Sequence, residues 1–491
     1  MKLHIVVLLA LAFAAAVRVA EPYNVLVTTL GVSGSQNMIM YRLADILGER
    51  AHNVTLLKHE VMSTARTVPL KHAKVWSFDL ATDQTLVEHI NGDFDVAIIH
   101  IMDLCTFAAL ERIGMRSTVC MSTALLMELM AWNSGVPFPT SYVPGFQVTA
   151  TDKMGLPQRL KNVIGVASTV AVFQYLLLPA YTNAFRRAYG DDFPDAQSLL
   201  RETQLYFVNA DLAFQSSRPL LPNFVHVGGL TMQKPQPLDA DWERLMNEPA
   251  NEGVVLFSLG TVANTSAMPF HIKMSFLKAF GRFPQYTFIY RLDGDLPPVG
   301  GVRNVRQVSW MPPRHLLGHS RVRAFITHGG YNSLTEATYA GVPMIVMPLF
   351  ADQLANAANV ADRGIGVVLQ KTEVSVDSVA RALDAVLHRP ELREAAARTA
   401  RLIQRKPFSG VEQAVKWVEY LAEFKELDVL KPEARFMPLL AYTYYHLDLL
   451  VIALCALLLQ LALAFFCLRC CWRRCCLASK VVVVSKNKKT Q

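Results

Sequence analysis

The fold is decided by the stretch Val322-Arg-Ala-Phe-Ile-Thr-His-Gly-Gly-Tyr-Asn-Ser-Leu-Thr-Glu336, in which an apolar run is followed by two glycines and the polar start of a helix. A strand, a tight turn and a helix in succession form the repeating unit of a parallel α/β sheet. The same alternation begins near Gly253 with Val-Val-Leu-Phe-Ser-Leu and continues beyond the stretch with Pro343-Met-Ile-Val-Met-Pro348. The second half of the chain is therefore predicted to form a doubly wound parallel sheet.

The first half of the chain shows the same alternation. Residues 23–28, 53–57 and 95–100 are predicted strands, and residues 38–51 are a predicted amphipathic helix between the first two. The sequence thus predicts two Rossmann-like domains. Ligands of such sheets bind at the carboxyl ends of the strands, which here border the cleft between the two domains.

The boundary between the two domains is expected in the proline-spotted stretch 219–237, which has the composition of a linker. We predict a first domain at residues 21–225 and a second domain at residues 226–425. A return segment at residues 426–448 then leads to the C-terminal part of the chain.

Both ends of the chain have the composition of membrane-targeting segments. Residues 1–20 combine an early lysine, a short apolar region and three successive alanines, which is the pattern of a secretory signal peptide. Residues 449–468 are uncharged and long enough, as a helix, to cross a hydrocarbon core of roughly 30 Å. The tail at 469–491 contains seven Lys or Arg and no Asp or Glu. This asymmetry predicts a single-pass type I protein with a cytosolic tail and a lumenal main body.

The net charge of +8 arises mainly in this tail, so the rest of the chain is close to neutral and a nucleic-acid partner is not expected. Lys488 and Lys489, at the end of the tail, resemble the dilysine signal that returns proteins to the endoplasmic reticulum. Asn53-Val-Thr and Asn264-Thr-Ser are glycosylation sequons. We therefore expect a glycoprotein of the endoplasmic reticulum membrane.

Residues 162–181 form another apolar run, with no charged side chain between Lys161 and Arg186. A second membrane span would return the tail to the lumen and would break the charge asymmetry. Two interpretations remain. The first, which we favour, is a helix buried in the core, and the second is a helix that lies in the membrane surface beside the binding site.

The glycine turn of the opening stretch suits an anionic ligand. Gly329 and Gly330 allow a close approach of the backbone, and Asn332 and Ser333 occupy a first helical turn whose N–H groups and dipole attract phosphate. Glu336 lies one turn further on, where its carboxylate can accept hydrogen bonds from two hydroxyl groups. Taken alone, these residues also fit an ordinary N-capped helix after a tight turn.

Residues on both sides extend the pattern to 310–353. Trp310 offers a flat indole for stacking on a base, and Asp352 and Gln353, at another predicted helix start, suit the hydroxyl groups of a sugar. The combined spacing closely resembles the signature of UDP-dependent glycosyltransferases, the family of the animal UDP-glucuronosyltransferases and UDP-glucosyltransferases. Three further segments resemble segments of the animal members, namely Phe257-Ser-Leu-Gly-Thr261, Arg218-Pro219 and Ser141-Tyr-Val-Pro144.

The resemblance covers essentially the whole chain and implies a glycosyltransferase-B fold, with two Rossmann-like domains and a C-terminal transmembrane helix. The first domain would bind the acceptor and the second the UDP-sugar. The implied reaction is the inverting transfer of a hexose or hexuronic acid from a UDP-sugar to a small lipophilic acceptor. The UDP-sugar is then a co-substrate, and neither a cofactor nor a metal ion is implied.

The resemblance also assigns roles to residues of the second domain. Trp310 would stack on uracil, Glu336 would hold the ribose, and Asp352 and Gln353 would bind the donor sugar. The diphosphate would be surrounded by Ser258, Thr261, His328, Gly330, Asn332 and Ser333. The chain departs from the family at Pro313, where the family usually has glutamine, so a side-chain amide and a backbone N–H are lost there.

The catalytic pair implied by the resemblance is absent from this sequence. The family uses a histidine after the first strand as general base, oriented by a carboxylate after a later strand. The corresponding positions hold Gln36 and His100, and glutamine cannot accept a proton. One hypothesis is that His100 is the base and is oriented by Asp103.

A second hypothesis is that the acceptor is an amine or another group that needs no strong base, so that proximity and stabilisation of the leaving group are sufficient. A third is a catalytically weak or inactive, membrane-anchored protein that binds a UDP-sugar or a small molecule. A lipid-linked sugar transferase is a further alternative. We favour a transferase. The sequence indicates neither the acceptor, nor glucose or glucuronic acid as the sugar, nor the oligomeric state.

Overall fold

The computed structural model of the chain describes residues 22–30, 34–59, 70–78, 87, 90, 94–211, 213–232, 236–248, 252–260, 263, 265–294, 296–297, 299–437 and 447–486. The predicted signal peptide, Thr261, the Asn264 sequon and the dilysine end lie outside these residues. The chain divides into two compact units, Met1–Pro432 and Glu433–Gln491.

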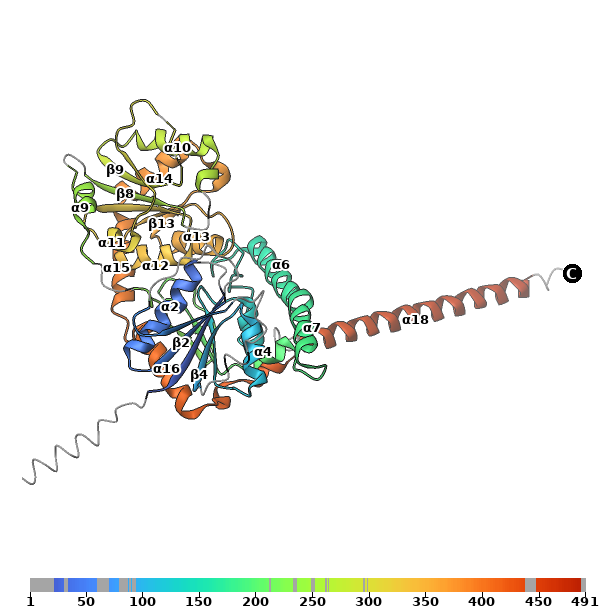
Figure 1. The fold of residues 1–491 in the computed structure, drawn as a ribbon. Coiled ribbons are helices and arrows are strands. Elements are labelled where there is room, and N and C mark those ends of the chain that lie inside the picture. Colours follow the sequence, from blue (N-terminus) through green and yellow to red (C-terminus); the bar gives the residue numbers. More distant parts are fainter. Residues whose placement is uncertain are drawn as a thin grey trace, which may run out of the picture. The chain divides into compact units, whose positions relative to one another are not determined.

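The first sheet of the larger unit contains seven strands in the described residues, all parallel, in the order β3-β2-β1-β4-β5-β6-β7 (Figure 1). The strands are β1 (Asn24–Leu30), β2 (Asn53–His59), β3 (Lys74–Phe78), β4 (Val96–His100), β5 (Thr118–Ser122), β6 (Leu205–Val208) and β7 (Phe224–His226). Successive strands are added on one side of β1 and then on the other. The strand order therefore changes direction at β1 and β4, and in such sheets ligands are expected at the carboxyl ends of the strands at this point.

Helices surround this sheet on both faces. They are α2 (Gly34–Glu49), α4 (Leu104–Arg112), α5 (Glu128–Ser134), α6 (Leu156–Val172), the π-helical segment η1 (Phe173–Leu177), α7 (Leu178–Tyr189) and α8 (Ala196–Arg201). One face of the sheet packs on α2 through a core that includes Val25, Leu43 and Val54. The other face packs on α4 and its neighbours through a core that includes Leu26, Ile99 and Phe107.

The second sheet contains six parallel strands in the described residues, in the order β10-β9-β8-β11-β12-β13. These are β8 (Gly253–Ser258), β9 (Tyr286–Arg291), β10 (Val305–Val308), β11 (Val322–Thr327), β12 (Met344–Val346) and β13 (Gly366–Val368). The order changes direction between β8 and β11. The predicted fold of two doubly wound parallel sheets is therefore confirmed.

The helices of the second half are α9 (Ala240–Met246), η2 (Thr265–Ala267), α10 (Phe270–Phe280), α11 (Pro313–Leu317), α12 (Tyr331–Ala340), α13 (Gln353–Asp362), η3 (Lys371–Glu373), α14 (Val376–His388) and α15 (Pro390–Gln404). They are followed by α16 (Gly410–Phe424), η4 (Asp428–Leu430) and η5 (Glu433–Phe436). Helix α16 belongs to the predicted second domain by sequence. Its residues Val415, Val418 and Leu421 nevertheless join the core formed by β1 and α2.

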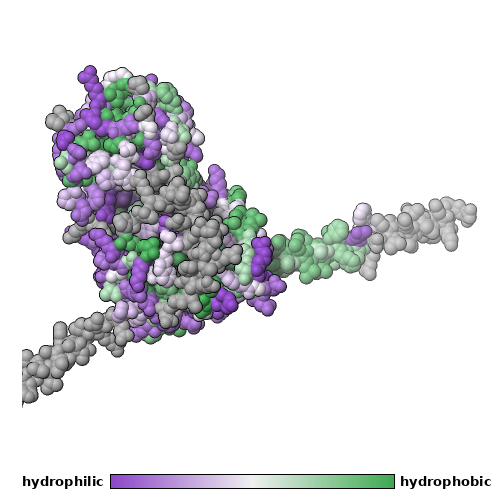
Figure 2. Space-filling view, in the orientation of Figure 1, coloured by the Kyte–Doolittle hydropathy of each residue, from purple (hydrophilic) through white to green (hydrophobic). Residues whose placement is uncertain are grey.

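The apolar run 162–181 lies in the continuous helical segment α6–η1–α7, and our preferred interpretation of a buried core helix is wrong. Only 11% of the apolar window in this segment is buried. Leu156, Leu160 and Tyr175 are 81%, 62% and 77% exposed, and Figure 2 shows hydrophobic residues on the outer side of α6. The run has no polar face, so its composition alone does not reveal which side contacts the core.

The smaller unit consists mainly of α18 (Leu447–Lys486), a single helix of 40 residues. Its part Val451–Trp472 is long and apolar enough to cross a membrane, and none of its apolar window is buried. The predicted span 449–468 lies within this helix. The helix continues beyond the span into the basic tail.

We predict that Asn162 attaches α6 to the body of the first half. Its side-chain amide donates hydrogen bonds to the carbonyls of Thr140 (2.7 Å) and Val143 (2.8 Å), and its carbonyl accepts one from the N–H of Gly145 (2.8 Å). The substitution Asn162→Ala leaves these buried backbone groups without partners, at a cost of about 2–4 kcal/mol in the free energy of unfolding. Thermal unfolding should show a clear decrease in Tm.

Ser168→Ala on the same helix is the matched control, because the Ser168 hydroxyl is exposed and bonds only to its own helix, at the carbonyl of Ile164. Its Tm should remain close to that of the unmodified protein. Equal Tm values for the two variants would contradict the proposed attachment.

Candidate active site

The loops after β8 and β11 meet around the side chain of His328. Gly260 has a positive φ of 77°, and a β-carbon at this position would lie 2.6 Å from the imidazole. A β-carbon at Gly330 would lie 2.4 Å from the same ring. Both residues must therefore be glycine for the two loops to close on His328. Burial lowers the pKa of His328 to about 4, so the ring is neutral at physiological pH.

Helix α12 begins where the sequence predicts a helix start. Its N-cap is Gly330, which has no side chain to occupy the first N–H groups, and Asn332 and Ser333 lie in the first turn. Ser258 ends β8, and its hydroxyl accepts a hydrogen bond from the N–H of Gly260 (3.3 Å). The β8 and β11 strands are neighbours. Ser258, His328, Asn332 and the glycine turn therefore share the edge at which an anion is expected.

Glu336 lies one turn further along α12, in a low-polarity environment. Burial raises the pKa of its carboxyl to about 7, and the positive charge of Arg314 opposes this shift. Arg314 is itself held by a hydrogen bond to the carbonyl of Thr231 (2.6 Å). A carboxylate and a guanidinium at this edge provide acceptor and donor groups for hydroxyls. The arginine was not singled out by the sequence analysis.

Arg291 connects Trp310 to the loop that follows β8 at Gly260 (the candidate donor loop), and the sequence analysis missed this residue. Arg291 ends β9 and is 8% exposed. Its guanidinium donates hydrogen bonds to the carbonyl of Gly260 and to the carbonyl of Ser309 (3.3 Å), and it forms an ion pair with Asp293 (3.2 Å). Ser309 directly precedes Trp310, whose indole is 45% exposed. The sequence signal that could have identified Arg291 is a charged residue at the end of an otherwise uncharged, buried strand.

Asp352 and Gln353 lie at the start of α13, as predicted. The side-chain oxygen of Gln353 accepts hydrogen bonds from the N–H groups of Leu349 (2.8 Å) and Phe350 (3.1 Å). These bonds stabilise a turn in which Ala351 has a φ of +55°, an unfavourable conformation for a residue other than glycine. The oxygen of Gln353 is thus used in the turn, and its NH₂ group is the part that suits a ligand.

His100 ends β4 and is 3% exposed. Its Nδ1 accepts a hydrogen bond from the N–H of Met102 (3.3 Å), and its Nε2 lies 3.2 Å from the hydroxyl of Thr123. Because a backbone N–H only donates, Nδ1 carries the lone pair and Nε2 carries the proton in the neutral ring. Burial lowers the pKa of His100 to about 4, despite the opposing charge of Asp103. Both ring nitrogens are therefore engaged in this arrangement.

The carboxylate of Asp103 contacts His59, whereas the sequence hypothesis pairs Asp103 with His100. Its Oδ2 accepts hydrogen bonds from the hydroxyls of Thr28 (3.0 Å) and Thr106 (2.8 Å) and lies 3.3 Å from Nε2 of His59. Burial by itself raises the pKa of the Asp103 carboxyl, but His59 and the hydrogen bonds from His59, Thr106 and Thr28 lower it below its usual value. No sequence signal connected His59, at the end of β2, with this edge.

Gln36 lies in the first turn of α2, which follows β1. Strands β1 and β4 are neighbours, with Val27 opposite Ile98. Gln36 and His100 thus belong to elements that meet at the same carboxyl edge. Their position agrees with the region in which the resemblance places the catalytic pair, and their catalytic roles stay predictions.

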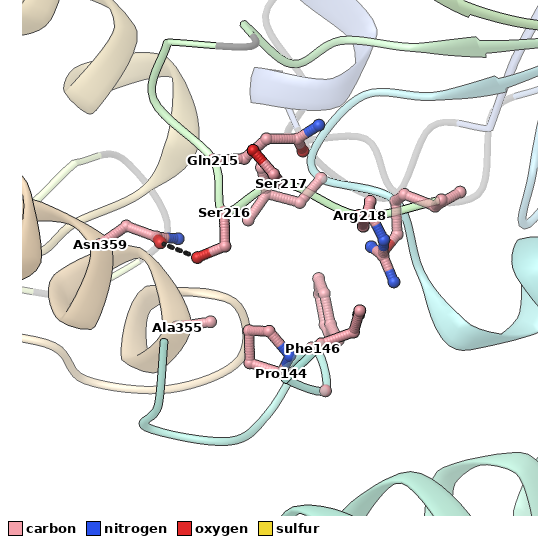
Figure 3. A pocket seen from close by; sticks show the side chains of 12 residues that line it. Pro144, Phe146, Gln215, Ser216, Ser217, Arg218, Ala355 and Asn359 are labelled. Atoms are coloured by element: carbon pink, nitrogen blue, oxygen red, sulfur yellow. Dashed lines mark hydrogen bonds between the residues drawn. The ribbon is translucent and has the colours of Figure 1, made fainter. Parts of the chain in front are cut away.

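A pocket lies between the two halves of the larger unit (Figure 3). Figure 3 shows the Ser216 hydroxyl bonded to the side-chain oxygen of Asn359 (3.3 Å), with Pro144 and Phe146 facing the same space. Much of the lining from the first half is apolar, and it includes Leu125, Leu126, Val143, Pro144 and Phe146. Asn359 belongs to α13, the helix that begins beside Asp352.

Two charged side chains, the partly buried Arg218 and the buried Glu128, support the wall of this pocket. Arg218 donates to the carbonyl of Leu126 (3.0 Å), and its guanidinium lies 4.6 Å from the centre of the Phe138 ring. Glu128 accepts a hydrogen bond from the N–H of Phe146 (2.6 Å). The motif residues Arg218 and Pro144 therefore shape the pocket.

Comparison with known proteins gives a consistent result. The family model described as UDP-glucoronosyl and UDP-glucosyl transferase matches residues 2–482. The UDP-glucuronosyltransferase 3A2 of Homo sapiens is 29% identical over 479 residues, covering 87% of this chain and 90% of the human protein. The UDP-glucuronosyltransferase 1A6 of Mus musculus is 33% identical over 356 residues, covering 72% of this chain and 64% of the mouse protein.

Among solved structures, the glycotransferase of kitacinnamycin has a TM-score of 0.58 to this chain at 18% identity. The match covers 82% of this chain and 98% of that protein. At this identity the likeness concerns the fold, and it agrees with the two parallel sheets described above.

We predict that Arg291 positions the donor loop relative to Trp310. Lysine has a single ammonium group and cannot reproduce the fork of hydrogen bonds that Arg291 makes. The variants Arg291→Lys and Arg291→Met should therefore raise the Kd for UDP by about 10-fold or more, since hydrogen bonds to charged groups contribute about 1.5–3 kcal/mol. Isothermal titration calorimetry provides the measurement.

The matched control is Arg282→Met, because Arg282 is exposed and pairs with Asp377 on the surface. Its Kd for UDP should be unchanged. A Kd for Arg291→Lys equal to that of the unmodified protein would exclude the positioning role, and thermal unfolding of both variants separates it from a loss of folding.

We predict a pH dependence from Glu336. With its pKa at about 7, the carboxylate that accepts two hydroxyl hydrogen bonds dominates above pH 7 and is lost as the pH falls below it. The affinity for uridine, which has a ribose but no titrating phosphate, should therefore rise from pH 6 to pH 8. Below pH 7 it should fall by up to about tenfold per pH unit.

The control for this titration is Glu336→Gln, which removes the titrating group and should bind uridine weakly and equally at all pH values. The pKa of His328, at about 4, lies outside this range. The same pH profile in both proteins would refute the assignment.

Proposed function

Because this chain belongs to the UDP-glucoronosyl and UDP-glucosyl transferase family and is a UDP-glycosyltransferase, we propose that it transfers a hexose or hexuronic acid to a small lipophilic acceptor. Transfer proceeds with inversion at the anomeric carbon. The observation that carries this proposal is the donor edge of the second sheet, where the glycine turn, the start of α12 and Glu336 come together.

The donor residues have separable roles in this proposal. Trp310 stacks on the uracil ring and Glu336 accepts hydrogen bonds from the ribose hydroxyls. The backbone at Gly330, Asn332 and Ser333 binds the diphosphate, helped by the dipole of α12. Neutral His328 donates a hydrogen bond to a phosphate oxygen. Ser258 at the end of β8 and Thr261 assist at the diphosphate, and Asp352 and the NH₂ group of Gln353 bind the donor sugar.

The acceptor side of the proposal follows from His100. Its Nδ1 lone pair accepts from Met102 and its pKa is about 4, so His100 is a poor general base in this arrangement. Stabilisation of the departing UDP by the donor edge then provides most of the catalysis. We therefore propose an acceptor whose attacking atom is already nucleophilic, such as an amine, or one that ionises readily, such as an acidic phenol.

The apolar pocket wall formed by Leu125, Leu126 and Phe146 supports a lipophilic acceptor. The exposed apolar side of α6–η1–α7 supports a body that contacts the membrane surface, from which such acceptors partition. We place the protein in the endoplasmic reticulum membrane as a single-pass type I protein with a lumenal active site. This placement rests on the apolar part of α18 and the basic residues that follow it.

The test uses the full-length protein in lipid nanodiscs with UDP-glucose or UDP-glucuronic acid and a panel of aliphatic alcohols, phenols and amines. We expect transfer to amines and acidic phenols with an inverted anomeric configuration. His100→Ala should retain this transfer to within a few-fold, and Glu336→Gln should raise KM for the UDP-sugar by about 10–100-fold. The matched control is His271→Ala, because His271 is an exposed histidine outside the candidate site, and this variant should keep the activity of the wild-type protein.

Each other outcome contradicts a defined part of the proposal. Loss of all transfer in His100→Ala would make His100 the general base and overturn the undemanding-acceptor hypothesis. Binding of UDP-sugar without transfer to any acceptor would indicate the inactive binding protein. A protein that does not bind UDP would refute the donor site itself.

A further inference from the structure

The cytosolic end of α18 carries a cluster of cysteines that the transfer reaction does not use. The sequence Cys467-Leu-Arg-Cys-Cys-Trp-Arg-Arg-Cys-Cys476 contains five cysteines within ten residues. Cys467, Cys470 and Cys471 are free and exposed on the helix. By contrast, Cys105 is half-buried and Cys120 is buried in the larger unit.

Helix geometry places the first three cysteines of this cluster on one side. With about 100° of rotation per residue, Cys467, Cys470 and Cys471 fall within an arc of about 100°. Arg469 points about 150° away from the centre of this arc. Over residues 467–471 the thiols thus share one side of the helix and Arg469 lies opposite. In the following turn the position of Arg474 returns to the direction of the thiols and that of Cys476 falls near the direction of Arg469, so thiols and positive charges that suit lipid headgroups alternate around the helix end.

The position of the cluster coincides with the edge of the hydrocarbon core. The apolar stretch extends to Leu468, which directly precedes Arg469. Cys470 and Cys471 follow the predicted span 449–468 by two and three residues, which corresponds to about 3–5 Å along the helix axis. Thiols at this depth are within reach of a reagent whose apolar chain is dissolved in the membrane.

Other uses of these cysteines fit the geometry poorly. Cys467, Cys470 and Cys471 do not form a group that could hold a metal ion. Disulfides are not expected on the reducing cytosolic side. Cys467, Cys470 and Cys471 are exposed on α18 and are not buried against the described residues of the smaller unit.

We propose that four cysteines of this cluster are S-acylated by fatty acyl groups, with Cys470 and Cys471 as the first sites and Cys475 and Cys476 in the following turn. Cys467 lies inside the predicted span 449–468 and is not a proposed site. This inference rests on the cytosolic orientation of the tail proposed above. A cysteine thiolate attacks the carbonyl carbon of a fatty acyl-coenzyme A thioester. A new carbon–sulfur bond forms, the bond to coenzyme A breaks, and coenzyme A leaves as the thiol with the proton lost by cysteine.

One thioester replaces another in this step, so no oxidant or reductant is required. The apolar helix already anchors the chain, and the acyl chains therefore do not decide attachment. They extend the apolar surface of α18 beyond Arg469 and fix the depth and tilt of the helix at the headgroup boundary. The transfer activity of the larger unit is expected to be unchanged.

The test is acyl exchange on the full-length protein in membranes of a eukaryotic host. Free thiols are blocked, thioesters are cleaved with hydroxylamine, and each released thiol is coupled to a polyethylene glycol maleimide that adds a fixed mass. We expect hydroxylamine-dependent mass increments in the wild-type protein, which carries no substitution. The double variant Cys470→Ser/Cys471→Ser should lose increments, and the variant with all four of Cys470, Cys471, Cys475 and Cys476 replaced by serine should show none.

The matched control is Cys105→Ser/Cys120→Ser, which should keep all increments because both cysteines lie in the larger unit. Increments that persist in the fourfold variant would overturn the assignment. So would the absence of increments in the wild-type protein. Protease digestion of sealed vesicles shows whether the tail is cytosolic, and transfer activity measured on the same membranes tests the proposed function separately.

Discussion

The imidazole of His328 packs between the backbones of Gly260 and Gly330, and a β-carbon at either glycine would come within 2.6 Å of the ring. This contact brings the loop after β8 against the loop after β11, so that the start of α12 is presented to a ligand. Arg291 then ties the β8 loop to Ser309, the neighbour of Trp310. The proposed positions of the uracil ring, the ribose and the phosphates therefore depend on one close approach of two loops. Only glycine allows this approach.

A second polar network determines the other side of the cleft. The carboxylate of Asp103 is bonded to Thr28, Thr106 and His59, which come from β1, α4 and β2. The hydrogen bonds of the Asp103 carboxylate thus go to these residues, whereas the ring nitrogens of His100 are engaged by Met102 and Thr123. At the carboxyl edge of the first sheet, His100 is therefore a neutral histidine with a lowered pKa, and our proposal assigns most of the catalysis to the donor edge for this reason.

The shared position of the candidate donor residues was largely predictable because these residues lie close together in the sequence. Gly330, Asn332, Ser333 and Glu336 follow from the pattern of one strand–turn–helix unit, and the structure places them at one edge. Arg291 and His59 were missed because each ends a different strand, and their partners lie about 20 to 45 residues away in the sequence. Which side chains pair over such separations depends on the order of the strands in the sheet. The local hydrophobic pattern of the sequence does not predict this order.

The sequence by itself determined the two parallel sheets, the apolar C-terminal helix and the residue types at the donor edge, because strand and helix periods and glycine turns are local properties. Only the tertiary structure decided which side of an element faces the core. It placed α6–η1–α7 on the surface although the run 162–181 is uncharged and mostly apolar, and it placed α16 in the core of the first half. It also showed that the carboxylate of Asp103 forms its contact with the imidazole of His59. Burial and pairing depend on which distant segments meet, and that information is absent from any single stretch of the chain.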